Sequence, residues 1–209
     1  MTRTIALLSA VLVAVLLAVG AYFALFSHSG DEFADCRGAT IAGGSASIGG
    51  PFTLVNEDGE TVTDKDVITK PSLLYFGYTF CPDVCPLDNA RNADAVDLLD
   101  KRGHDVTPVF ISIDPARDTP EVMAEFTDYL SPKMIGLTGS PEQVNAASQA
   151  YRTYFKKQPS DDPDYYLMDH STFTYLVFPK DGFVDFFRRD VTAEQMADRV
   201  ACYVDAGAE

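Results

Sequence analysis

The chain has 209 residues, with 16 lysines and arginines against 31 aspartates and glutamates, so its formal net charge is −15 at pH 7. Such an acidic surface repels phosphate backbones, which excludes nucleic acid as a natural partner. Four cysteines at this length are too few for a disulfide scaffold, and the length suits one domain with a sizeable core.

The N-terminal segment is an apolar run without a charge, the 22 residues from Ile5 to Phe26. A helix needs about 20 apolar residues to cross a hydrocarbon core, so this run predicts one transmembrane helix. A cleaved signal peptide is the alternative, with residues 18–21 as a weak cut site. Its apolar core would usually span only about 7–15 residues, which favours a retained anchor.

The charges around this run predict its orientation. Arg3 precedes it, and three acidic residues follow it, namely Asp31, Glu32 and Asp35. The positive-inside rule therefore leaves the N-terminus in the cytoplasm and exports the rest. Because the leader is not Arg-rich or amphipathic, mitochondrial import is disfavoured. We expect a single-pass protein of a bacterial inner membrane whose domain lies in the periplasm.

Three parts follow from composition and periodicity: a transmembrane anchor (1–26), a tether rich in Gly, Ser and Ala (27–48), and a folded domain (49–205). Proline at helix starts, a Thr-x-x-Gln capping box and continuous apolar runs delimit the elements of the domain. In chain order these are a hairpin (52–56 and 60–63), a buried strand (72–78), a helix from Pro86 to Gly103, a buried strand (106–113), a helix (119–129), a short strand (134–137), a helix (140–151), a second hairpin (172–178 and 183–188) and a final helix (192–205).

This order predicts an α/β domain with a mixed central sheet. Its most informative segment is YFGYTFCPDVCP, which places Cys81 and Cys85 at a strand-to-helix junction. A cysteine pair at such a junction is typical of a thioredoxin-like fold, although the C-x-x-x-C spacing is one residue longer than C-x-x-C. The pair can exchange electrons as a dithiol and a disulfide, or bind a soft metal as thiolates. A purely structural disulfide is the third reading.

One distant histidine can join the pair. His170 stands in the triplet Asp-His-Ser, whereas His28 in the tether and His104 after a helix-ending glycine are expected to be surface residues. A single histidine is most often a structural, hydrogen-bonded residue. Together with the two thiolates it would form a Cys₂His set, which suits copper and especially Cu(I), and would also suit zinc.

Several carboxylates lie near these residues in the sequence. Asp83 is either a hard oxygen donor to Cu(II) or a solvated loop residue, and Asp169 is a candidate to orient His170 from outside the ligand set. We expect a mobile acidic loop over the site, formed by Asp161, Asp162 and Asp164.

A further segment, ISIDPARDTP from Ile111 to Pro120, has the pattern of a strand, a tight turn and a helix cap. Asp114 is expected to accept turn hydrogen bonds. Arg117 and Asp118 are expected to pair on the surface or to dock a partner. A structural role for the segment is the preferred reading.

Three motifs together resemble the SCO/SenC family of membrane-anchored, copper-binding assembly factors of cytochrome c oxidase, which have a thioredoxin-like fold. They are YFGYTFCPDVCP (75–86), ISIDPARDTP (111–120) and DYYLMDHS (164–171), and the resemblance extends over roughly residues 49–200. It implies that the copper ligands are Cys81, Cys85 and His170.

The resemblance also implies a function. The reduced cysteines would bind one copper ion, Cu(I) or Cu(II), with His170 and pass it by ligand exchange to the dinuclear copper site of oxidase subunit II. Oxidation to a Cys81–Cys85 disulfide would abolish the site. Another periplasmic copper chaperone and a thioredoxin-like reductant are the further expected partners.

Three rival classes remain open. A thiol–disulfide oxidoreductase reducing the cysteines of that oxidase site would not need His170. A peroxidase needs a positive partner for its thiolate, and neither Arg nor Lys lies near Cys81 in the sequence. A scaffold that only binds partners would not need either cysteine. The expected role is that of a metallochaperone rather than an enzyme.

Two more cysteines, Cys36 and Cys202, lie outside the three motifs near the two ends of the exported part. We expect them to form a disulfide that joins the tether to the final helix. The alternative is a membrane-proximal free thiol that receives copper or pairs between molecules.

Overall fold

The computed structural model describes residues 12–22, 32–37, 48–162 and 164–207, which fall into two compact units, up to Asp35 and from Cys36 onward. Of the predicted transmembrane run, the described part is residues 12–22, which are helical. Within the described ranges, no helix has both the length and the apolar character that crossing a bilayer requires. The remainder of that run, and most of the predicted tether, lie outside the described residues.

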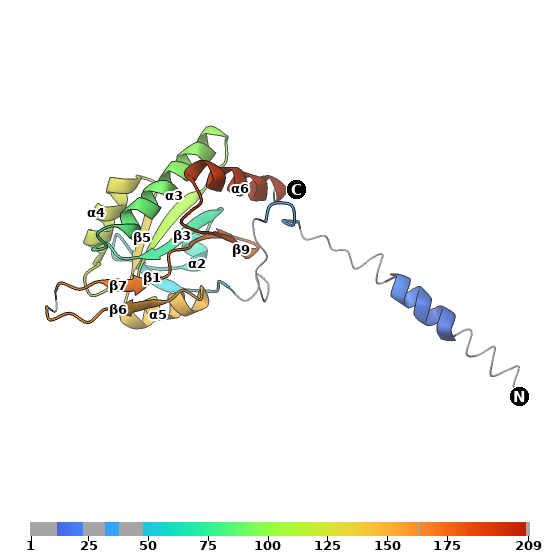
Figure 1. The fold of residues 1–209 in the computed structure, drawn as a ribbon, viewed down its shortest axis with the longest axis horizontal. Coiled ribbons are helices and arrows are strands. Elements are labelled where there is room, and N and C mark those ends of the chain that lie inside the picture. Colours follow the sequence, from blue (N-terminus) through green and yellow to red (C-terminus); the bar gives the residue numbers. More distant parts are fainter. Residues whose placement is uncertain (1–11, 23–31, 38–47, 163, 208–209) are drawn as a thin grey trace, which may run out of the picture. The chain divides into compact units, whose positions relative to one another are not determined.

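The second unit is built on a seven-stranded sheet with the order β2-β1-β5-β4-β3-β8-β9 (Figure 1). Strands β3, β4 and β5 are parallel neighbours, while the pairs β1–β2, β1–β5, β3–β8 and β8–β9 are antiparallel. The predicted mixed α/β sheet is therefore confirmed. The strands are β1 (Thr53–Asn56), β2 (Thr61–Thr63), β3 (Ser72–Gly77), β4 (Thr107–Ser112), β5 (Ile135–Thr138), β8 (Thr174–Phe178) and β9 (Gly182–Phe187).

Among the described residues of this unit, five helices accompany the sheet: α2 (Asp64–Val67), α3 (Val84–Lys101), α4 (Pro120–Leu130), α5 (Pro141–Ala150) and α6 (Ala193–Ala206). Helices α3 and α6 pack against each other on one side of the sheet, and α5 lies on the other side (Figure 1). Side-chain caps start three of them, because the hydroxyls of Thr119, Ser140 and Thr192 each accept a backbone N–H of the first turn. Helix α3 begins at Val84, two residues earlier than predicted, so Cys85 lies within its first turn.

The centre of the sheet consists of β3 and β4, in which every residue is buried. Such strands are covered on both faces, which explains their continuous apolar runs. In an α/β sheet, ligand sites form beyond the carboxyl ends of the parallel strands. Strand β3 ends at Gly77, and the cysteine loop begins there.

A second sheet was not predicted from the sequence. It pairs β6 (Phe155–Lys157) with β7 (Met168–His170) in antiparallel register, with Phe155 opposite His170. The sequence prediction placed His170 at the start of a strand from Thr172, but that strand, β8, begins at Thr174. His170 instead ends β7, whose three residues are too few to give a periodic pattern.

A disulfide joins Cys36 to Cys202, with a Cα–Cα distance of 5.7 Å. Cys202 belongs to α6, so the bond attaches the start of the second unit to its last helix. The other two cysteines, Cys81 and Cys85, are free thiols.

Candidate metal centre

The cysteine loop connects the buried end of β3 to the N-terminus of α3. Cys85 N–H, in the first turn of α3, donates to Cys81 Sγ at 3.3 Å. Asp83 is the N-cap residue of that helix but makes no side-chain cap bond. The sulfur of Cys81 thus accepts a hydrogen bond from one of the backbone N–H groups that a capping side chain would otherwise satisfy.

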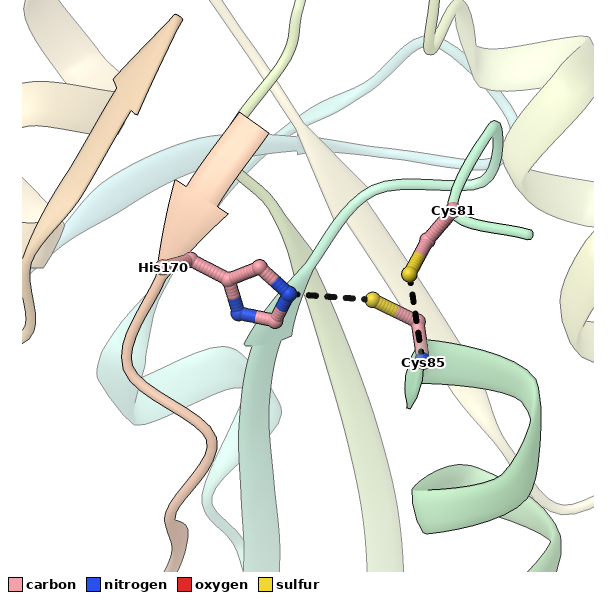
Figure 2. A group of neighbouring side chains, drawn as sticks. All are labelled: Cys81, Cys85 and His170. Atoms are coloured by element: carbon pink, nitrogen blue, oxygen red, sulfur yellow. Dashed lines mark hydrogen bonds between the residues drawn. The ribbon is translucent and has the colours of Figure 1, made fainter. Parts of the chain in front are cut away.

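His170 brings an imidazole to the same point from β7 (Figure 2). Its Nε2 lies 3.4 Å from Cys85 Sγ. The donor atoms of Cys81, Cys85 and His170 all lie within 4.8 Å of one another. Two sequence-distant segments therefore converge on one small volume.

The hydrogen bond at the other ring nitrogen assigns the tautomer of His170. Nδ1 lies 2.8 Å from the carbonyl oxygen of Ser171, which can only accept, so Nδ1 carries the proton. The lone pair of Nε2 then faces the sulfurs, as metal coordination requires. Sulfur and nitrogen ligands about 2.0–2.3 Å from one ion lie roughly 3.5–4 Å apart, so a small inward movement of the side chains closes the site.

The two thiols differ in exposure and acidity. Cys85 is 0% exposed and Cys81 is 8% exposed. The hydrogen bond from the Cys85 thiol, helped by the backbone amides of Cys85 and Asp83, lowers the pKa of Cys81 well below that of an ordinary thiol, although burial opposes it. The same hydrogen bond and burial raise the pKa of Cys85. These opposite shifts favour one thiolate and one thiol in the metal-free reduced site.

The aromatic side chains of Tyr75 and Tyr78 flank the imidazole. Each ring stands edge-on to His170, at centroid distances of 6.2 and 5.8 Å. The phenol oxygen of Tyr78 accepts the backbone N–H of Met168, which fastens β7 beside the cysteine loop. The aromatic run is visible in the sequence, but a role for these two tyrosines beside the metal centre was not predicted, because His170 is far away in the sequence.

Known proteins that resemble this chain identify its family. The family model described as SCO1/SenC matches residues 41–205, which is most of the chain. Protein SenC of Rhodobacter capsulatus is 60% identical over 205 residues, covering 98% of this chain and 92% of that protein. The chain belongs to the SCO1/SenC family.

Solved structures of two other family members have copper bound. The crystal structure of Arabidopsis thaliana ScoI with copper bound is 43% identical, covers 76% of this chain and 98% of the solved one, and superposes with a TM-score of 0.72. The Bradyrhizobium japonicum ScoI structure with copper bound is 40% identical, covers 75% and 99%, and has a TM-score of 0.68. The chain spans about half the length of one plant relative, the mitochondrial SCO1 homolog 1 of Arabidopsis thaliana, at 44% identity over 158 residues, which is 75% of this chain and 47% of that protein.

In this SCO1/SenC chain the ISIDPARDTP segment holds the cysteine loop. Asp118 is fully buried, and its carboxylate accepts hydrogen bonds from Thr79 Oγ1 at 2.6 Å, Thr79 N–H at 3.2 Å and Ser112 Oγ at 2.6 Å. The prediction of a surface pair between Asp118 and Arg117 is therefore wrong. A buried carboxylate needs donors, and Thr79, two residues before Cys81, supplies two of them.

Arg117 pairs with Asp114 instead, with Nε 2.6 Å from Oδ2. Its guanidinium lies over the ring of Tyr166, 3.6 Å from the centroid, and 4.7 Å from that of Phe80. The Tyr166 hydroxyl donates to Asp114 at 2.7 Å. These contacts join the turn after β4 to the β6–β7 connection and the cysteine loop.

The remaining predicted residues lie outside the donor cluster. Asp169 is exposed and accepts a hydrogen bond from Gln158 at 2.7 Å, so in this structure it does not orient His170, whose partner is Ser171. Asp83 is exposed at the N-cap of α3. The exposed residues Asp161, Asp162 and Asp164 lie in the β6–β7 connection, next to Tyr165, whose ring stands 5.3 Å from that of Phe80.

Proposed function

We propose that this chain binds one copper ion through Cys81, Cys85 and His170 and acts as a copper chaperone in the assembly of cytochrome c oxidase. The observation that carries the proposal is the convergence of the three donor atoms within 4.8 Å. Two thiolates and an imidazole form a soft donor set that suits copper, and Cu(I) in particular. Family members with bound copper support the same reading.

The recipient in this proposal is the dinuclear copper site of oxidase subunit II, as the family resemblance implies. Transfer takes place by ligand exchange, in which incoming ligands replace those of the chaperone one at a time. Cys81 is the more exposed of the two sulfurs and the one that ionises first, so it is the first to meet incoming copper. Cys85 holds the ion from the buried side, and the half-buried His170 supplies the nitrogen ligand from β7.

The location is part of the proposal. The apolar run from Ile5 to Phe26 is long enough to anchor the chain in a bacterial inner membrane. Arg3 keeps the N-terminus in the cytoplasm, so the domain with the copper site lies in the periplasm. There it would receive copper from another periplasmic chaperone.

The test is a Cu(I) titration of the reduced full-length chain against a competing chelator. We expect one high-affinity copper per chain, and a loss of at least about 10-fold in affinity for each of Cys81→Ser, Cys85→Ser and His170→Ala. His104→Ala is the matched control, since His104 lies 3.6 Å from Asp205 near the end of α6. Wild-type affinity in the Cys81 and His170 variants would refute the assignment.

A second function, thiol–disulfide exchange, is favoured by the acidic thiolate of Cys81 beside the buried thiol of Cys85. Cys81 would attack a disulfide of subunit II, and Cys85 would then displace the product thiol, leaving a Cys81–Cys85 disulfide for a thioredoxin-like reductant to reduce. This activity needs no metal. If it dominates, metal-free His170→Ala protein will reduce an oxidised subunit II domain at the wild-type rate, whereas a copper chaperone alone will not reduce it.

A further inference from the structure

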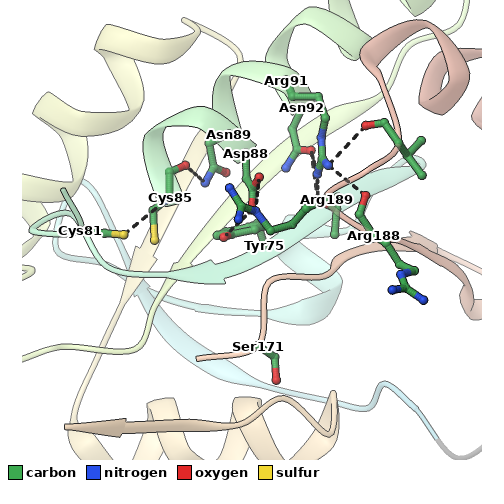
Figure 3. A network of polar contacts seen from close by, with 12 residues as sticks. Tyr75, Cys81, Cys85, Asp88, Asn89, Arg91, Asn92, Ser171, Arg188 and Arg189 are labelled. Carbon is green, nitrogen blue, oxygen red and sulfur yellow. Dashed lines mark hydrogen bonds and ion pairs between the residues drawn. The ribbon is translucent and has the colours of Figure 1, made fainter. Parts of the chain in front are cut away.

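A buried carboxylate lies one helical turn beyond Cys85. Asp88, 4% exposed, follows Cys85 by three residues on α3, so both side chains project from the same face of the helix. Its partners are Tyr75, whose hydroxyl donates to Oδ2 at 3.0 Å, and Arg189, whose Nε lies 3.1 Å from both carboxylate oxygens (Figure 3). Tyr75 opens the motif YFGYTFCPDVCP, but nothing in the sequence pattern pairs it or Arg189 with Asp88.

Tyr75 connects this carboxylate to the donor cluster. It is fully buried, and its ring stands edge-on to His170 with an interplanar angle of 83°. A Cβ atom at Gly77 would lie 2.9 Å from Cys85 Sγ, from Tyr75 Cε1 and from a ring carbon of Phe110. The sulfur and the tyrosine ring thus border the same small space beside the glycine, so the ring limits the positions open to the sulfur.

Arg189 is itself held in place by a second arginine. Arg91, on α3, donates to the carbonyl oxygen of Arg188 and to Thr174 Oγ1, both at 3.0 Å. These bonds attach the turn after β9 to α3, as Figure 3 shows, and direct Arg189 over Asp88. The side chain of Arg189 is 44% exposed, so the network runs from the surface to the buried cysteine.

We propose that Asp88 and Arg189 are positioning residues of this centre: they hold the Tyr75 ring, which in turn holds the Cys85 sulfur beside His170, so that it stays a thiol hydrogen-bonded to Cys81 and does not join it in a disulfide. Without Arg189, the Asp88 carboxylate is a buried charge that has lost its counter-ion, so it must reorient towards other donors. That change weakens the hydrogen bond that holds Tyr75. The part of this inference that concerns copper rests on the proposed function, while the part that concerns the dithiol does not.

The metal-free dithiol gives the first readout. In equilibrium with dithiothreitol, the Cys81–Cys85 disulfide gains two electrons and two protons to become two thiols, and dithiothreitol becomes its cyclic disulfide. A freer Cys85 sulfur reaches Cys81 more easily, so loss of the network favours the protein disulfide. We expect Arg189→Gln, Asp88→Asn and Tyr75→Phe to shift this equilibrium of the full-length chain towards the disulfide.

Two matched controls separate positioning from a general charge effect. Arg188→Gln removes the same charge one residue away, where the side chain lies 3.7 Å from Asp190, and Asp94→Asn removes an exposed carboxylate from the same helix. Both should keep the wild-type equilibrium. Cu(I) affinity is the second readout, and we expect it to fall about 10-fold in the three network variants and not in the controls.

The double variant Tyr75→Phe/Arg189→Gln decides whether Arg189 acts through Tyr75. If it does, adding Arg189→Gln to Tyr75→Phe changes neither readout further. Additive effects, or an Arg189→Gln protein that behaves as Arg188→Gln does in both readouts, would overturn the inference.

Wild-type protein that fails to bind copper would refute the proposed function instead, and the dithiol equilibrium would still decide the positioning role. Should Asp88→Asn not fold, the half-exposed Arg189 carries the test.

Discussion

Cys81 and Cys85 belong to one short loop, yet their surroundings give them different chemistry. Cys81 receives hydrogen bonds from a thiol and from amides at the start of α3, and these lower its pKa. Cys85 is fully buried and donates its thiol hydrogen bond to Cys81, so it keeps its proton and its pKa is raised. A helix N-terminus favours a negative sulfur, which explains why the thiolate is the one outside the helix.

This difference predicts selective alkylation of the reduced, metal-free chain. Iodoacetamide should modify Cys81 well before Cys85, since the thiolate is the nucleophile. An ordinary thiol reacts about tenfold more slowly for each pH unit below a pKa of about 8.5. Because the pKa of Cys81 lies well below that value, its rate should change little between pH 7 and pH 6. Peptide mapping by mass spectrometry after timed alkylation measures both sites.

The control for this prediction is Cys85→Ala, which removes the thiol that donates to Cys81. Its alkylation rate at Cys81 should regain part of the ordinary dependence on pH. A tenfold loss of rate per pH unit in the wild-type protein would contradict the assignment of the thiolate.

At the scale of elements, the site depends on the turn after β4 as much as on the cysteine loop. Asp118 accepts two hydrogen bonds from Thr79 at the start of that loop and one from Ser112 at the end of β4. The loop is thereby fastened to two neighbouring parallel strands. A motif that resembles a turn and a helix cap in the sequence is therefore also the support of the metal centre.

We expect Asp118→Ala to lower the free energy of unfolding by about 3 kcal/mol, because it leaves buried donors without an acceptor. The copper affinity should fall as well, since Thr79 lies two residues from Cys81. The matched control is Asp128→Ala, at an exposed position on α4. Urea unfolding followed through the tyrosine signal, with a copper titration of the same variants, measures both effects; an Asp118→Ala protein as stable as Asp128→Ala would contradict the expected role.

The same carboxylate predicts a dependence on pH. Burial, only partly offset by the hydrogen bonds from Ser112 and Thr79, raises the pKa of Asp118 above its ordinary value of 3.8. The contribution of this group to stability is therefore fully present below pH 3.8 and is lost as the pH rises through the folded-state pKa. The stability of the wild-type chain relative to Asp118→Asn should be greater at pH 4 than at pH 7 in urea unfolding. The opposite trend would show that the hydrogen bonds outweigh burial.

Long strands and helices with a regular hydrophobic pattern were predictable from the sequence, whereas short strands and buried polar side chains were not. The strands from Ser72 and Thr107 stand out as apolar runs, and the last helix is marked by its capping box. Strands β6 and β7 have three residues each, so their pairing is set by tertiary contacts. The burial of Asp118 could not be foreseen either, because a lone aspartate in a sequence does not reveal which donors will surround it.

At the scale of the whole second unit, the metal centre and the disulfide between Cys36 and Cys202 lie on different elements. The disulfide closes a loop with a sequence separation of 166 residues. It links Cys36 to α6, the helix that packs on α3. Cross-linking so long a loop removes conformational entropy from the unfolded chain, and native disulfides contribute about 2–5 kcal/mol in small secreted domains. The exported location that we propose keeps such a bond oxidised.

Replacing both of these cysteines should therefore separate stability from copper binding. We expect Cys36→Ser/Cys202→Ser to lower the free energy of unfolding by about 2–5 kcal/mol, as measured by urea unfolding of the full-length chain in detergent. The Cu(I) affinity of the folded protein should stay at the wild-type value, because all three donor atoms come from the cysteine loop, the first turn of α3 and β7. A double variant that keeps its stability but loses copper would mean that this pair, and not the Cys₂His set alone, takes part in holding the metal.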